Sequence, residues 1–247
     1  MPIWGPSAAI LEIFIILTVA VIGFLLCFFL KRSGRTDAFV APASLLWLGL
    51  SFAFFLSGVG SLLTWFGNLE IERIIDYFVN IFIQLSLIPG SYYPTLKVFG
   101  NKKFSRNVAV VFSLLTLVFL FQLFKYGLVE VHGKIIYYGL NFVPHFNAEI
   151  VTLFSLLLLV LLGFYDMSLR LIKWTREKKI SDIYKFLSTL SLVLLVFAAG
   201  VNQAGWITDV KVLIFTRVIV FGIFMMAFVS FLNEEKPPMP PKNILIV

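Results

Sequence analysis

The stretch EIERIIDYFVNIFIQLSLIPGSYY, residues 70–93, is an apolar run that carries polar side chains deep inside it. Those side chains recur every three or four positions, at Arg73, Asp76, Asn80 and Gln84. This spacing places them on one face of an α-helix, stacked turn upon turn. Because a charge near the centre of a bilayer costs about 2.5–3.5 kcal/mol on insertion scales, we expect this face to point toward other helices or a water-filled cavity. The remaining helices are then expected to pack around it.

The composition of the chain is that of a membrane protein. Hydrophobic residues make up 60% of the 247 positions, charged residues only 13%, and the mean hydropathy is +0.98. Soluble domains are closer to about 45–50% apolar and 25% charged. The apolar runs are about 20 residues long, the length that spans a bilayer, and the shortest, at 186–201, can start a turn earlier. The predicted fold is all-α, a single domain over residues 1–232 with seven transmembrane helices at about 7–30, 43–65, 70–97, 107–128, 144–165, 186–201 and 210–232.

The distribution of basic residues predicts the orientation. Fifteen of the twenty Lys and Arg residues fall in the connections and the tail on one side of the predicted membrane, within residues 31–35, 97–106, 170–185 and 236–242. Four lie on the other side, and Arg217 lies within the last helix. Because basic loops stay in the cytoplasm, the N-terminus is expected outside, and the proline-rich tail 233–247 is expected inside the cell. The net charge of +7 then faces anionic lipid of the cell membrane and needs no nucleic-acid partner.

Polar residues of the predicted outer half of the membrane define a candidate ligand pocket. The pocket is expected to open outward between the helices at 70–97, 144–165, 186–201 and 210–232, whereas the inner half is nearly pure Leu, Val and Phe. Its predicted lining consists of Asp76, Asn80, Gln84, His145, Glu149, Asn202, Gln203 and Arg217. Asn80 and Gln84 also suit hydrogen bonds between helices without any ligand.

Arg217 lies about two turns, or roughly 10 Å, into the last predicted helix. A guanidinium at that depth needs a carboxylate partner or a route to the interface. Asp76 has a comparable depth and is the first predicted partner, with Glu149 the second. Such a pair serves either to fix helix packing or to form the floor of the pocket.

The sequence offers no cofactor site. Its two histidines, His132 and His145, lie in or beside a predicted outer loop, so neither a metal site nor bis-histidine haem ligation is expected. Seven helices with an external N-terminus is the topology of rhodopsins, but retinal needs a lysine in the middle of the last helix. Lys211 lies at the mouth of that helix, and the deep Arg217 cannot be deprotonated, so no retinal is expected.

The leading functional prediction is a sensory, receptor-like or accessory membrane module, and no enzyme. It is expected to bind a small polar ligand or protons and to relay the signal through the helices at 186–201 and 210–232. The expected partner is another membrane or cytoplasmic protein, bound at the basic loop 166–185. The layout is similar to that of the seven-helix modules that precede bacterial histidine kinases, in helix count and loop length alone. The alternatives are a small transporter or channel subunit and a structural subunit packed through its 28 Phe residues.

Two local features are also predicted. Proline removes a backbone donor, so the helix at 70–97 is expected to bend near Pro89. The segment 129–143 is expected to form either a small hairpin or an interfacial segment, with its two tyrosines in the headgroup layer. A transporter would need polar residues or helix breaks that continue into the inner half, and only Pro89-Gly90 and Ser91 offer one in the sequence.

Overall fold

The computed structural model describes residues 5–32, 38, 40–130, 142–178, 180–203 and 210–233. They form α1 (Gly5–Arg32), α2 (Val40–Trp65), α3 (Leu69–Phe99), α4 (Lys102–Tyr126), β1 (Leu128–Glu130), β2 (Phe142–Pro144), α5 (Phe146–Glu177), α6 (Ile180–Gln203) and α7 (Val210–Asn233). Seven helices in this part of the chain are long and apolar enough to cross a membrane, as predicted. The proline-rich tail falls outside the described residues.

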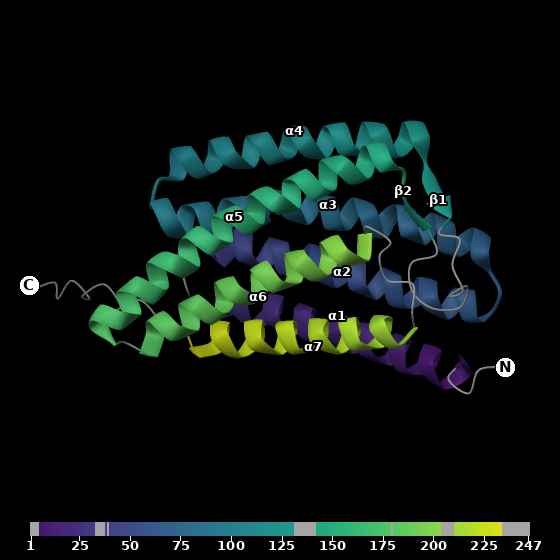
Figure 1. The fold of residues 1–247 in the computed structure, drawn as a ribbon, viewed down its shortest axis with the longest axis horizontal. Coiled ribbons are helices and arrows are strands. Elements are labelled where there is room, and N and C mark those ends of the chain that lie inside the picture. The colour runs from purple at the N-terminus through teal and green to yellow at the C-terminus, as the bar shows by residue number, and fades with distance from the viewer. Residues whose placement is uncertain are drawn as a thin grey trace, which may run out of the picture.

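The helices form an elongated bundle and run roughly along its long axis, with α5 crossing the others obliquely (Figure 1). Around the bundle, α1 packs on α2 and α7, and α6 packs between α5 and α7. Helix α3 contacts α2, α4 and α5 as well as β2. We call the end that holds the two strands the hairpin end, and the opposite end, where α5 and α7 finish, the basic end (Figure 1).

The distribution of polar and apolar side chains is the reverse of that in a soluble domain. Large apolar side chains cover the outside, and Phe121 and Phe124 of α4 are 63% and 69% exposed. Charged and amide side chains lie inside, among them Glu12, Glu72, Asp76, Asn80, Gln84, Asp166 and Arg217. An apolar coat around buried polar groups suits hydrocarbon surroundings, where no water is available to hydrogen-bond a lipid-facing polar group.

The apolar core is built from aromatic contacts and small residues. Trp47 of α2 packs edge-on against Phe224 of α7, with ring centroids 5.1 Å apart. Between α5 and α6, a Cβ on Gly163 would collide with the side chain of Val193. Small residues of this kind let membrane helices approach closely, which provides much of their attraction in lipid.

Helix α4 begins at Lys102, five residues before the predicted start at 107. The preceding Gly100 has a left-handed backbone with φ of 63°, which ends α3. The side chain of Asn101 then accepts hydrogen bonds from the backbone N–H groups of Lys103 and Phe104, at 3.0 and 3.1 Å. This Gly-Asn pair is a strong local signal for the end of one helix and the start of the next.

The basic stretch at 166–185 was predicted as a loop into which the preceding helix could extend by a turn or two, but almost all of it is helical. Helix α5 continues to Glu177, and α6 begins at Ile180. Residues 178 and 179 join them, and Lys178 has the left-handed conformation at φ of 50°. The side chains at 171–178 are exposed. Positive charge in this region therefore lies on two helix ends rather than on a flexible connection.

The segment after α4 begins and ends with short strands. Strands β1 and β2 pair antiparallel, with Leu128 opposite Pro144 and Glu130 opposite Phe142. Of the two predicted alternatives, the described ends of this segment form a hairpin, while residues 131–141 lie outside the described chain. The buried Phe142 and Leu128 join a small apolar cluster with Phe119 and Leu123 of α4, which holds the hairpin on the bundle.

Helix α3 continues without interruption through Pro89 and Pro94. Each proline deprives the carbonyl four residues earlier of its helical hydrogen bond. The predicted bend near Pro89 stays a prediction.

The orientation can be tested with an impermeant thiol reagent on intact cells, in a Cys27→Ser background. Single cysteines at Lys102 and Lys178 are expected to stay unlabelled, and a cysteine at Lys134 is expected to react, because the basic end should face the cytoplasm. Labelling at position 102 from outside, with none at 134, would reverse the orientation.

Candidate functional site

A column of four buried side chains runs along α3, one helical turn apart, at Glu72, Asp76, Asn80 and Gln84. Three of them were predicted, but the fourth was predicted to be Arg73. Arg73 is instead exposed, and its guanidinium carbon lies 5.8 Å from the ring centroid of Phe142. Arg73 is close to the start of α3, where its long side chain reaches over the hairpin and avoids burial of the charge. We call the four buried residues the polar column.

The hairpin end of the polar column holds two carboxylates, which we call the carboxylate site. The Asp76 side chain is 3% exposed and accepts a hydrogen bond from the backbone N–H of Phe142. Its Oδ2 atom has no hydrogen-bond partner among the described residues. Both acidic side chains face α2 at Gly60, where an added Cβ would lie 3.8 Å from Glu72 Cγ and 4.0 Å from Asp76 Oδ1.

The other end of the polar column links α3 to α4 and α5. Thr152 of α5 donates a hydrogen bond to Gln84 Oε1 at 3.2 Å. The hydroxyl of Thr116 in α4 lies 3.5 Å from the backbone oxygen of Gln84. Gln84 Nε2 is buried and has no partner in the described part of the chain. Gln84 of α3 therefore contacts both α4 and α5, and its Nε2 group can still donate a hydrogen bond.

The predicted pairing of Arg217 with Asp76 is wrong. Arg217 Nε donates to Glu12 Oε1 of α1 at 3.3 Å, and both side chains are almost completely buried. This pairing also replaces the second predicted partner, Glu149. The ion pair joins the first helix to the last, which pack side by side in the bundle.

Arg217 also borders a small cavity of about 50 Å³. The cavity is lined by side chains of α2, α3, α6 and α7, mostly apolar, with Ser57 and Thr216 as its other polar residues. The polar column does not line it, although Val79 and Ile83 of α3 do. The predicted single pocket is therefore divided between the polar column and the surroundings of Arg217.

The remaining predicted pocket residues lie at the rim of the hairpin end. His145 caps α5, stacks on Tyr126 with centroids 5.1 Å apart, and is half-buried. Glu149, one turn further along α5, is also half-buried. Asn202 and Gln203 lie in the last turn of α6, where the side chains are outside the described set.

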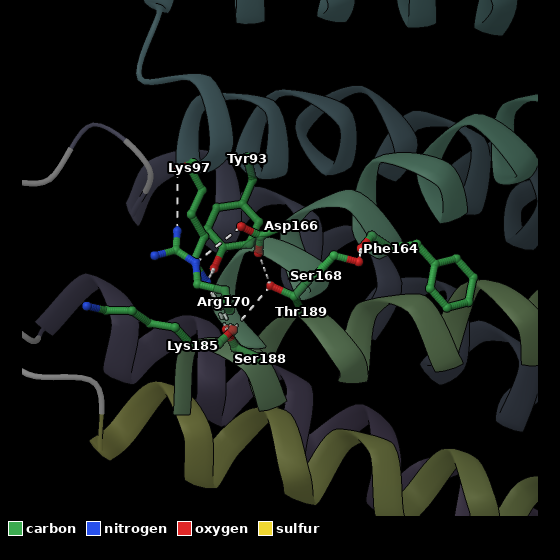
Figure 2. A network of polar contacts seen from close by, with 9 residues as sticks. All are labelled: Tyr93, Lys97, Phe164, Asp166, Ser168, Arg170, Lys185, Ser188 and Thr189. Carbon is green, nitrogen blue, oxygen red and sulfur yellow. Dashed lines mark hydrogen bonds and ion pairs between the residues drawn. The ribbon is translucent and has the colours of Figure 1, made fainter. Parts of the chain in front are cut away.

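A second polar cluster at the basic end lies in the half that was expected to be nearly pure Leu, Val and Phe (Figure 2). Its centre is Asp166 of α5, which is fully buried. Arg170 Nε donates to Asp166 Oδ1 at 3.2 Å, and Thr189 of α6 donates to Oδ2 at 2.5 Å. Both carboxylate oxygens are thus satisfied by groups of α5 and α6.

Lys97 connects α3 to this cluster. Its ammonium group donates to Ser188 Oγ of α6 at 3.0 Å and to the Tyr93 hydroxyl at 3.2 Å. Arg170 Nη2 lies 3.4 Å from the Lys97 backbone oxygen, at the end of α3. We call these residues of α3, α5 and α6, together with Asp166 and Thr189, the basic-end network (Figure 2).

The sequence contains a local signal for this network. Asp166 and Arg170 are four residues apart, the spacing of an ion pair on a helix. Because both residues were assigned to a loop, their helical spacing was not taken into account. Thr189 could not be matched to Asp166, because a contact between two helices leaves no pattern in one sequence.

Comparison of the chain with known protein families, with curated proteins and with solved structures found no match. Within the described residues, no group of three or more His, Cys, Asp or Glu side chains is arranged to hold a metal ion. The structural class is a seven-helix bundle suited to a membrane, with buried polar clusters near both ends.

Replacing one member of the Glu12–Arg217 pair strands the other charge inside the bundle. We expect Glu12→Leu and Arg217→Leu each to lower the free energy of unfolding by about 3–5 kcal/mol. The double variant should lose clearly less than the sum, because it removes both charges. Melting curves of the four proteins in detergent measure this coupling. As a control, Asp76→Leu combined with Arg217→Leu should show simple additivity, and coupling there instead of with Glu12 would contradict the pairing.

Proposed function

We propose that this protein is a receptor-like membrane module that senses a small cation, the proton included, at the carboxylate site and transmits the change to its basic end. The observation that carries the proposal is the buried Asp76 carboxylate, whose Oδ2 has no partner among the described residues. A buried polar atom without a partner is costly, so it marks a place that a ligand or a proton can fill.

The charge at the carboxylate site selects the class of ligand. Glu72 and Asp76 are one helical turn apart, and two negative charges at this spacing repel each other. Burial strengthens the repulsion, because the surroundings screen charge less than water does. A proton or a small cation relieves it, whereas an anion would increase it. Gly60 contributes no side chain at this point, where an added Cβ would be in ordinary contact with Ile75, Glu72 and Asp76.

Helices α3 and α5 are the proposed route between the two ends. Helix α3 carries both the polar column and Lys97 of the basic-end network. Helix α5 contacts the polar column through Thr152 and the basic-end network through Asp166. A change at the carboxylate site therefore has two continuous helices through which to shift the basic end. This route replaces the relay through the last two helices that the sequence analysis predicted.

The exposed end of α5 is the proposed surface for a cytoplasmic or membrane partner. A helix of 32 residues is about 48 Å long, which exceeds the roughly 30 Å hydrocarbon core of a bilayer. Its last turns carry exposed Lys173 and Arg176 together with Trp174. The mixture of basic and aromatic side chains suits either headgroups or an acidic partner protein.

One observation favours transport as a second candidate function. Buried polar residues of α3 continue toward the basic end at Ser91 and Thr95, whose hydroxyls donate to backbone oxygens of the same helix. A transporter needs polar residues or helix breaks that continue in this way into the other half of the membrane. Cation flux into liposomes containing the purified chain distinguishes this function from sensing.

The sensing proposal can be tested with an environment-sensitive fluorophore on a cysteine at Thr175, near the end of α5, in a Cys27→Ser background. In nanodiscs, the signal is expected to change on acidification from mildly alkaline to mildly acidic pH, or when sodium replaces choline at constant ionic strength. Asp76→Asn should abolish the response, because it removes the charge that the cation neutralises.

Glu70→Gln is the matched control, since Glu70 is an exposed acid on the same helix. It should respond like the parent protein. An unchanged response in Asp76→Asn, or the same loss in Glu70→Gln, would contradict the proposal. Cation flux that depends on Asp76 would replace sensing with transport.

A further inference from the structure

An apolar groove of about 400 Å³ lies on the outside of the bundle, between α4 and α5 toward the basic end. This volume is within the roughly 300–1,000 Å³ of small-molecule sites. The groove is lined by Phe99, Val108, Val111, Phe112, Leu158, Leu161, Leu162 and Tyr165. Apart from the Tyr165 hydroxyl, these side chains offer nothing that binds a polar ligand. The groove therefore suits a hydrocarbon chain.

Aromatic contacts border the groove at the basic end. Phe99, the last residue of α3, packs on Phe104 with centroids 5.0 Å apart and stacks on Tyr165 at 5.8 Å. The turn between α3 and α4 follows immediately, at Gly100 and Asn101. The groove thus points from the middle of the bundle toward this turn.

Positive charge is concentrated where the groove ends. Lys102, Lys103 and Arg106 lie in the first turns of α4, and all three are exposed. None of them forms an ion pair among the described residues. No Asp or Glu occurs between Pro94 and Val129 to neutralise them. The nearest turn of the groove, at Val108, is about 9 Å along the helix axis from Lys102, which is within reach of a lipid headgroup above its acyl chain.

We infer that this groove and turn form a binding site for an anionic phospholipid. One acyl chain lies in the groove between α4 and α5, and the phosphate of the headgroup lies against the basic first turns of α4. The apolar lining selects the chain, and the charge selects the anionic headgroup over a zwitterionic one. A soluble acidic peptide would contact the basic turn and leave the groove unused, so the combination of both features favours lipid.

Native mass spectrometry of the full chain in detergent, with phosphatidylglycerol or phosphatidylcholine added, tests the site. The parent protein should retain phosphatidylglycerol more strongly than phosphatidylcholine. Neutralising basic residues with Lys102→Gln, Lys103→Gln and Arg106→Gln should weaken its retention by about fivefold for each charge removed. Lys125→Gln, at the far end of α4, is the control for loss of one positive charge. It should leave the retention of phosphatidylglycerol unchanged.

The groove is tested separately by filling it. Val111→Phe should displace the lipid, whereas Val110→Phe should not, because Val110 is equally exposed but does not line the groove. Equal retention of both lipids by all variants would mean a non-specific lipid coat and would overturn the inference. Sensitivity to the charges without sensitivity to Val111→Phe would also overturn it, because the headgroup would then bind without the groove.

Discussion

The constraint on which this structure depends is that polar groups inside an apolar coat must be satisfied by one another. Hydrocarbon surroundings supply no hydrogen bonds, so a buried carboxylate or guanidinium fixes the position of its partner. The Glu12–Arg217 pair holds the first helix against the last in this way. Asp166 does the same for α5 and α6 through Arg170 and Thr189. The apolar contacts fill the space between these polar contacts, but they fix the relative positions of the helices less specifically.

The polar groups differ in how completely they are satisfied, and this difference underlies the functional proposal. Both oxygens of Asp166 have partners, whereas Asp76 keeps a buried oxygen without one in the described chain. A satisfied network stiffens the helices that it joins, and a partly satisfied one leaves a place for a ligand. In the proposed function, the basic-end network holds the ends of α3 and α5 in place, and the signal enters at the carboxylate site.

The number of helices and the buried face of α3 could be predicted from composition and spacing, because both follow from local periodicity. The partner of Arg217 could not, since Glu12 lies 205 residues away and depth alone did not separate it from Asp76. The basic stretch after residue 166 was read as a loop because its charge resembles that of a connection. Helix α5 continues through it, since Asp166 is neutralised by Arg170 one turn later.

The central claim is that the carboxylate site is coupled to the basic end through α3 and α5. Hydrogen–deuterium exchange of the parent protein and Asp76→Asn in nanodiscs tests it directly. The account predicts altered deuterium uptake in peptides from the end of α5, residues 166–177, with no change in peptides from α7. A change confined to peptides around position 76 would contradict the coupling.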